Sequence, residues 1–173
     1  REWLSLYDSK SGERGIFNRQ SAKKQAAKNG RRDTDYDFGC NPCSEIILRP
    51  YQFCNLSEVV ARETDTLVSL KEKVRLATIL GTFQSTLTNF KYLRKIWKNN
   101  TEEERLLGVS LTGIMDCATL HKGKEVADTL EVLRVTAIDA NKAMAWELGI
   151  EQSAAITCVK PSGTVSQLVD SAS

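Results

Sequence analysis

Two long amphipathic patterns, separated by short apolar runs, constrain the fold of this chain most strongly. In each pattern, apolar residues recur at steps of three and four, which places them on one face of a helix. The first comprises Leu67, Leu70, Val74, Ala77, Leu80, Phe83, Leu87 and Phe90, after Asp65-Thr66 as candidate N-caps. The second comprises Val126, Leu130, Leu133, Ala137, Met144 and Leu148, closed by Gly149. The sequence therefore predicts two long helices, each with one buried face.

The apolar and β-branched runs between these patterns are short enough to be strands. They are 44–49, 53–60, 106–111 and 154–160, and the turn-forming residues 49–52 separate the first two. Strands that alternate with long helices favour parallel pairing. The predicted fold class is therefore α/β.

Shorter helices are expected around this framework. They are a helix over 17–29, a second over 92–98, and a third that begins at Thr101, where Glu102, Glu103 and Glu104 give capping-box spacing and an acidic first turn. A last helix should follow the turn Pro161-Ser162-Gly163-Thr164.

Composition narrows the classes of function. The chain has 173 residues, 41% of them hydrophobic, which is enough for one ordinary core, and a net charge of +2. Its two basic clusters lie on helix-like stretches and are interpreted as solvated faces, so neither a nucleic-acid nor a membrane partner is expected. No apolar run reaches membrane-spanning length. Five irregularly spaced cysteines favour a reducing, cytoplasmic setting in which thiol chemistry is functional.

The segment 39–48 carries an amide, a thiol and a carboxylate at alternate positions. In an extended backbone Asn41, Cys43 and Glu45 point the same way, and Pro42 biases Asn41 towards extended geometry. From spacing alone, a surface strand with three polar residues remains an alternative.

Three segments in order resemble the adenosylcobalamin-dependent (class II) ribonucleotide reductases. They are Asn41-Pro42-Cys43-Ser44-Glu45-Ile46, Phe53-Cys54-Asn55-Leu56-Ser57-Glu58 and Lys160-Pro161-Ser162-Gly163-Thr164-Val165-Ser166-Gln167-Leu168. The segment 11–18 is a weaker fourth match. The resemblance runs along nearly the whole chain.

The resemblance implies a ten-stranded α/β barrel built of two half-barrels, with the Cys43 segment as a finger loop through its centre. Residues 1–173 would form the central part of that catalytic barrel, with both flanks missing, because chain continues beyond both ends in the family. The remaining parts of the same subunit are thus expected partners, and the isolated chain is expected to be inactive.

The family also implies roles for residues of the first two motifs. Cys43 matches the cysteine that becomes a thiyl radical when the cobalt–carbon bond of adenosylcobalamin breaks, and it would remove the 3′ hydrogen of the substrate ribose. Glu45 would act as general base on the 3′-hydroxyl, and Asn41 would hold the ribose hydroxyls. Cys54 matches one half of a redox pair whose partner lies upstream, re-reduced by a thioredoxin-type donor.

The third motif predicts a phosphate site at Ser162, Gly163 and Thr164. These residues follow an apolar strand and open a helix, where free backbone donors and the helix dipole favour an anion. The segment is not a Walker loop. In the family this position binds the substrate's phosphates, and overall resemblance favours a ribonucleoside triphosphate over a diphosphate as the substrate reduced to the 2′-deoxyribonucleotide.

Two alternatives remain open. One is a folded but inactive fragment or structural module. The other is a zinc or thiol-redox module, because Cys40 and Cys43 form a C-x-x-C, to which Cys117 and His121 would add two ligands. Roughly 75 residues separate these half-sites. We therefore interpret Cys117, Cys158 and His121 as packing residues and expect no metal site.

Overall fold

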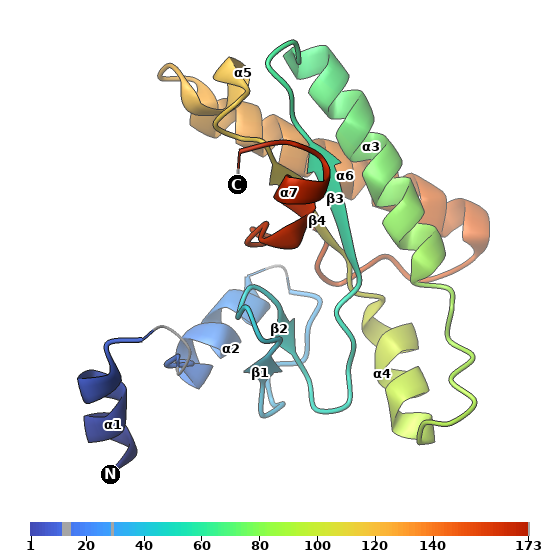
Figure 1. Cartoon of the computed structure of the whole chain (residues 1–173). Coiled ribbons are helices and arrows are strands. Elements are labelled where there is room, and N and C mark those ends of the chain that lie inside the picture. Colours follow the sequence, from blue (N-terminus) through green and yellow to red (C-terminus); the bar gives the residue numbers. More distant parts are fainter. Residues whose placement is uncertain (12–14, 29, 173) are drawn as a thin grey trace.

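The computed structural model describes residues 1–11, 15–28 and 30–172, arranged as a parallel strand pair backed by two long helices, with a smaller region below it (Figure 1). The elements are α1 (Glu2–Ser9), α2 (Arg19–Ala27), β1 (Gly39–Cys40), β2 (Ile47–Leu48), β3 (Leu56–Val60), α3 (Leu67–Gln84), α4 (Lys95–Glu104), β4 (Gly108–Thr112), α5 (Ala118–His121), α6 (Val126–Leu148) and α7 (Thr164–Leu168). Residues 12–14 of the weak fourth motif, and Asn29 of the first predicted helix, lie outside the described residues.

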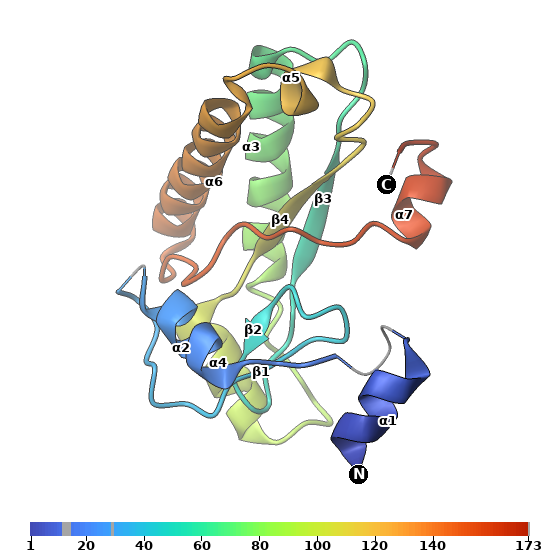
Figure 2. The ribbon, with the colours of Figure 1, turned by 90° about the vertical axis from the view of Figure 1, so that its left-hand side faces the viewer.

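Strands β3 and β4 pair in parallel, with Leu56 opposite Gly108 and Val60 opposite Thr112. Beyond β4, the segment 155–158 continues the sheet through one parallel bridge between Val109 and Thr157. The view in Figure 2 places α3 and α6 on one side of the strands and α7 on the other. The predicted α/β class with parallel pairing is confirmed, although 154–160 forms a single bridge rather than a regular strand.

The main core lies between the strands and the two long helices. Val59, Val109, Leu70, Val74 and Leu133 are all at most 4% exposed in this cluster. Because side chains alternate along a strand, the odd-numbered residues of β3 and β4 face these helices and the even-numbered ones face the opposite side. Burying one apolar side chain of this size stabilises the fold by about 1.5–3 kcal/mol.

The ends of the long helices follow from their side chains. The Thr66 hydroxyl accepts a hydrogen bond from the Ser69 amide, and the Ser69 hydroxyl accepts one from the Thr66 amide. Together they form a complete capping box at the predicted start of α3. The predicted end at Phe90 is wrong, because Ser85 and Thr86 donate their hydroxyls to nearby helix carbonyls and the chain leaves the helix there. Helix α6 ends as predicted at Gly149, whose φ is 64°.

The predicted helix start at Thr101 is also wrong. Residues 101–104 form the last turn of α4, and Arg105 ends that helix with φ 42°. Acidic groups are unfavourable at a helix C-terminus, but here arginines from distant segments neutralise them. Arg49 pairs with Glu103 and Glu104 at 2.9 and 3.1 Å.

A buried ion cluster of Arg32, Arg49 and Glu104 joins the smaller region to α4. Arg32 donates two hydrogen bonds of 2.9 Å to the Glu104 carboxylate and a third, of 3.0 Å, to the carbonyl of Ile47. Gln52 donates to the same carboxylate at 2.6 Å. The cluster thereby fixes the short antiparallel pair β1–β2, in which Gly39 lies opposite Leu48.

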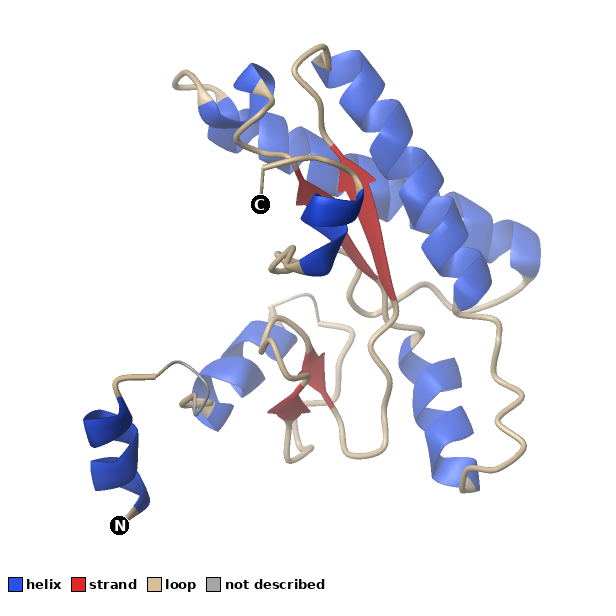
Figure 3. Ribbon diagram, in the orientation of Figure 1, coloured by secondary structure: helices blue, strands red, loops and turns tan. Residues whose placement is uncertain are grey.

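Secondary-structure colouring shows that α1 stands apart from the rest of the chain (Figure 3). Helix α1, which no sequence pattern predicted, buries none of its residues. Among the described helices, none combines the length and the apolar character needed to cross a membrane.

Candidate active site

The segment between β1 and β2, residues 41–46 (the Cys43 loop), is a tight turn closed by one side chain. Asn41 Oδ1 accepts a 3.0 Å hydrogen bond from the amide of Ile46, and the Asn41 carbonyl accepts a 2.9 Å bond from the amide of Ser44. Ser44 has a φ of 64°. The extended backbone expected for this segment is therefore wrong, because Asn41 bonds across the loop and folds it back.

The turn nevertheless brings the three predicted polar groups together. Asn41 Nδ2 donates to Glu45 Oε1 at 2.6 Å. Lys160 Nζ lies 3.4 Å from the same oxygen and donates to Cys43 Sγ, also at 3.4 Å. One amide, one thiol, one carboxylate and one ammonium thus share a single patch.

Two members of this patch are shielded from solvent: the Glu45 side chain is only 4% exposed, and Asn41 is 7% exposed. Burial, the largest influence, raises the pKa of the Glu45 carboxyl, but hydrogen bonds from its own backbone and Asn41 and the charge of Lys160 together hold that pKa below its usual value. Its second oxygen, Oε2, is buried without a hydrogen-bond partner among the described residues. An ionised carboxylate with a free acceptor oxygen is suited to receive a proton.

Cys43 is exposed at the turn and its thiol is free. Cys40 donates its thiol to the Ser44 hydroxyl at 3.5 Å and supports the same turn. The loop thus presents Cys43 outwards while Glu45 points into the fold.

Lys160, for which no sequence pattern predicted a role, is the residue that contacts both Cys43 and Glu45. Its position as the first residue of the third motif was the available signal. The contact itself joins positions 117 residues apart, and no local pattern reveals that.

The predicted phosphate residues follow Lys160 directly. Ser162 accepts a 2.9 Å hydrogen bond from the Thr112 hydroxyl at the end of β4. Gly163 precedes the first residue of α7, and a Cβ placed on it would meet nothing within 4 Å, so its backbone is open to a ligand. Thr164 is exposed. The Cys43 loop and this motif are therefore neighbours in space.

Cys54 lies just before β3 with an exposed, free thiol. No hydrogen bond among the described residues links it to the Cys43 loop. Nearby, burial and then the charge of Glu45 raise the pKa of the Cys158 thiol to about 12, so Cys158 is a poor nucleophile.

The sheet face towards the loop carries polar groups without partners. Glu58 and Ser110 lie opposite each other on β3 and β4, and Glu58 Oε1 and Ser110 Oγ are both buried with no hydrogen bond from the residues that the structure describes. Gly108 is closely packed here, since a Cβ on it would lie 2.5 Å from Leu56 Cδ2 and 3.1 Å from Cys158 Sγ.

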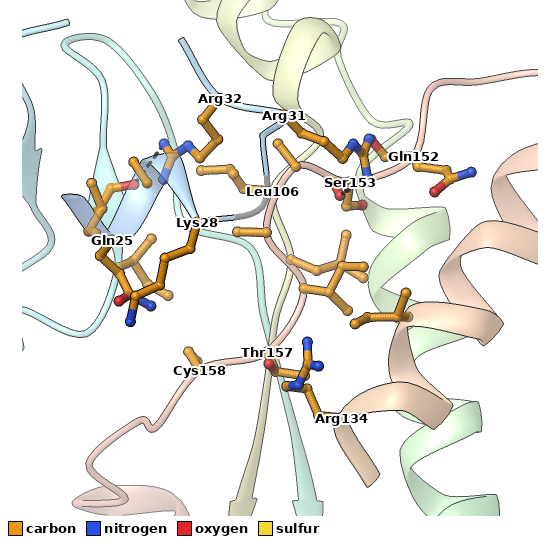
Figure 4. A pocket seen from close by; sticks show the side chains of 18 of the residues that line it. Gln25, Lys28, Arg31, Arg32, Leu106, Arg134, Gln152, Ser153, Thr157 and Cys158 are labelled. Carbon is orange, nitrogen blue, oxygen red and sulfur yellow. Dashed lines mark hydrogen bonds between the residues drawn. The ribbon is translucent and has the colours of Figure 1, made fainter. Parts of the chain in front are cut away.

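A cavity of about 640 Å³ lies next to the loop, whose Glu45 and Ile46 contribute to its lining (Figure 4). Glu45 and Cys158 line one part of it, and Lys28, Arg31 and Arg134 add positive charge. Arg31 is anchored there by a 2.7 Å hydrogen bond to the carbonyl of Ser153.

The predicted zinc or thiol-redox alternative is not favoured. Cys117 is fully buried in the main core, as its interpretation as a packing residue predicted. His121 Nδ1 is engaged with the carbonyls of Ile114 and Cys117 at 3.0 and 2.9 Å. The described part of the chain holds no group of three or more His, Cys, Asp or Glu side chains placed to bind a metal ion.

Comparison with known proteins gives one consistent result. The chain is 28% identical over 197 aligned residues to the adenosylcobalamin-dependent ribonucleoside-triphosphate reductase of Lacticaseibacillus paracasei, which covers 95% of this chain and 26% of that protein. The proteins of the same name from Lactobacillus acidophilus and Lactobacillus helveticus are 31% and 30% identical over 75% and 91% of this chain, and 21% and 25% of their own. The chain therefore spans about a quarter of the length of the curated relatives it matches.

A solved structure, described as a B-12 dependent (class II) ribonucleotide reductase, has a similar fold. The TM-score is 0.62 at 24% identity, over 83% of this chain and 23% of that one. No protein-family model matches the sequence. The relatives confirm the resemblance that the three motifs indicated.

Proposed function

We propose that this chain, a relative of the adenosylcobalamin-dependent (class II) ribonucleotide reductases, is the central catalytic part of such an enzyme. Its reaction would be the reduction of ribonucleoside triphosphates to 2′-deoxyribonucleotides. The observation that carries the proposal is the convergence of Asn41, Cys43 and Glu45 on one patch beside the segment 160–164.

Each group in the patch suits one part of this reaction. When bound, adenosylcobalamin would supply the radical that converts the Cys43 thiol into a thiyl radical. The exposed, unbridged thiol of Cys43 fits that role, because the cofactor and then the ribose must both reach the sulfur. Glu45 would take a proton from the ribose 3′-hydroxyl, and Asn41 would orient the ribose hydroxyls while it holds the Glu45 carboxylate.

The face of the sheet that carries the loop supports the proposed barrel. Buried polar atoms without partners, on Glu58 and Ser110, require water, a ligand or further protein chain to satisfy them. In the proposed ten-stranded barrel, β3, β4 and the segment after α6 are neighbouring strands, α3 and α6 lie outside, and the Cys43 loop is the finger inside. The rest of the subunit would close the other side.

Two further roles complete the proposal. Ser162, Gly163 and Thr164 would bind the substrate's phosphates with an open backbone and two hydroxyls. Cys54 would supply reducing electrons together with a cysteine in the remaining part of the subunit, and a thioredoxin-type protein would restore the pair. The exposure of Cys54 suits an exchange partner.

The test separates the two cysteines in a complete enzyme that carries this segment. Cys43→Ser should abolish deoxynucleotide formation and any substrate-dependent radical signal, because serine cannot replace the thiyl. Cys54→Ser should keep the substrate-dependent radical signal but block multiple turnovers, because one thiol alone cannot form the disulfide that supplies two electrons. Cys40→Ser is the matched control and should retain multiple turnovers. A substrate-dependent radical signal in the Cys43 variant, or multiple turnovers in the Cys54 variant, would contradict the proposed roles.

A further inference from the structure

Lys160 lies between the two chemically active groups of the Cys43 loop. Its Nζ is 3.4 Å from Cys43 Sγ and 3.4 Å from Glu45 Oε1, and its side chain is 27% exposed. A single ammonium therefore bridges the proposed radical site and the proposed base.

The backbone around Lys160 is held at two points. Before it, the amide of Cys158 donates to the carbonyl of Val109 at 3.1 Å. After it, Ser162 accepts the 2.9 Å hydrogen bond from the Thr112 hydroxyl. Both anchors are on β4, so the sheet fixes where the base of the lysine side chain starts.

The charges around Glu45 show what the ammonium contributes. Cys43 on the same loop and Cys158 on the segment after α6 are the titratable thiols near it, and Lys28, Arg31, Arg32 and Arg134 line the adjoining cavity. Arg32 is committed to Glu104, and Arg134 to Glu131 at 2.6 Å. Lys160 is in direct contact with the carboxylate. Burial disfavours the charged form of a carboxyl, and the ammonium of Lys160 adds to the hydrogen bonds from the Glu45 backbone and Asn41 that favour that form.

We propose that Lys160 is a positioning residue of this site, whose ammonium holds the Cys43 thiol and the Glu45 carboxylate in one arrangement and keeps the carboxylate ionised. The inference rests on the proposed function and adds a residue to it. An ionised Glu45 can accept the proton of a ribose hydroxyl, which moves from the hydroxyl oxygen to the carboxylate oxygen. A neutral Glu45 cannot.

The arrangement also couples two parts of the substrate site. Lys160 is two residues from Ser162. A phosphate bound at residues 162–164 would therefore hold in place the backbone from which the Lys160 side chain extends. A direct phosphate ligand is the rival role for this lysine. The two roles differ in kinetics, because a phosphate ligand acts on substrate affinity whereas an ammonium on Glu45 acts on the proton transfer.

The experiment compares Lys160→Met and Lys160→Arg in the complete enzyme, with kcat and KM for the ribonucleotide measured from about pH 3 to pH 9, a range that includes the acidic limb set by Glu45. Lys142→Met is the matched control, because it removes an exposed lysine on α6 away from the loop. Lys160→Met should lower kcat about tenfold or more near neutral pH, leave KM within about twofold, and move the acidic limb of the profile to higher pH. Lys160→Arg should return the acidic limb of the profile most of the way to its wild-type position, because arginine keeps the positive charge.

A second readout needs no turnover. The infrared difference between the enzyme and its Glu45→Gln variant isolates the carboxylate band of Glu45, and its titration gives the pKa directly. In the Lys160→Met background that pKa should rise, and in the Lys142→Met background it should not move.

The outcomes separate the two levels of inference. A wild-type enzyme that makes no deoxynucleotide would overturn the proposed function, while the infrared titration would still decide the role of Lys160. A higher KM with an unmoved limb would overturn the positioning role in favour of a phosphate contact. An unmoved Glu45 titration, or a lost activity that Lys160→Arg does not rescue, would also overturn it.

Discussion

The two faces of the β3–β4 sheet use the same strands for opposite purposes. On the helix-facing side, Val59 and Val109 are at most 4% exposed against α3 and α6, and Ser57 donates its hydroxyl to the Ala77 carbonyl at 3.1 Å. On the loop-facing side, Glu58 Oε1 and Ser110 Oγ are buried with no partner among the described residues. Alternate residues of one strand thus face two different environments. On one side the polar group has a hydrogen-bond partner, and on the other the buried polar groups have none among the described residues.

The difference indicates which face of the sheet still needs partners for its buried polar groups. A buried polar group without a hydrogen bond costs about 1–3 kcal/mol, and folds rarely retain several on one surface without a reason. The helix-facing side supplies stability, and the loop-facing side is arranged for something that binds there.

The largest expected effect follows from leaving the loop-facing side open. The 173-residue chain alone should form no deoxynucleotide even with adenosylcobalamin and a reductant, because no described residue satisfies the buried polar atoms of that face. Product analysis with the complete enzyme as the positive control checks this. Deoxynucleotide formed by the chain alone would show that this face needs no further protein.

The helix-facing side should respond through stability. Leu70→Ala removes a side chain that is 0% exposed, and it should lower the free energy of unfolding by about 2–5 kcal/mol. Leu80→Ala on the same helix removes a side chain that is 62% exposed and should change it by less than about 0.5 kcal/mol. Urea unfolding followed by circular dichroism measures both. Similar losses would mean that α3 does not bury the face described here.

The loop-facing side should respond through binding. Gly163→Val should weaken nucleotide affinity at least about tenfold, because a side chain blocks the approach of phosphate to backbone donors whose charge-assisted bonds are worth about 1.5–3 kcal/mol each. The variant should fold, since a Cβ at Gly163 meets nothing within 4 Å. Titration with the nucleotide and with the matching nucleoside checks this. An equal loss for both ligands would point to a folding defect, and unchanged nucleotide affinity would remove the phosphate assignment.

The smallest and sharpest comparison uses two serines on opposite faces. Ser57→Ala loses a hydrogen bond and should destabilise the chain by about 0.5–1.5 kcal/mol. Ser110→Ala removes an unpaired buried hydroxyl and should be neutral or stabilising by up to about 1 kcal/mol. Thermal or urea unfolding decides between them. Equal destabilisation would mean that Ser110 is as well satisfied as Ser57.

Local patterns predicted the framework and left the long-range contacts unseen. The periodicity of α3 and α6, the cap at Thr66 and the end at Gly149 are properties of neighbouring residues, and they were predicted correctly. The acids at residues 102–104 were misread as a helix start, because the arginines that pair with Glu103 and Glu104 lie more than 50 positions away. Acidic residues normally favour the first turn of a helix, but a carboxylate that is paired with a distant arginine can also lie in the last turn.

The candidate site divides in the same way. The Asn41–Glu45 contact spans four residues and could be anticipated, although through a turn rather than an extended strand. Lys160 could not, because its contacts depend on the path of the chain through β4 and α6. The roles of the predicted site residues stay predictions until the variants are measured.

The buried cluster of Arg32, Arg49 and Glu104 has a consequence for the order of assembly during synthesis. Arg32 holds the Ile47 carbonyl next to the Cys43 loop, and its own carboxylate partner lies 72 residues later. Closing so long a segment has an entropic cost that must be met before the contact forms. On the ribosome, the hairpin that carries Cys43 therefore lacks this long-range support until Glu104 has emerged from the exit tunnel, and the ammonium of Lys160 arrives later still. The reactive thiol is thus made before both of the distant groups that support its loop.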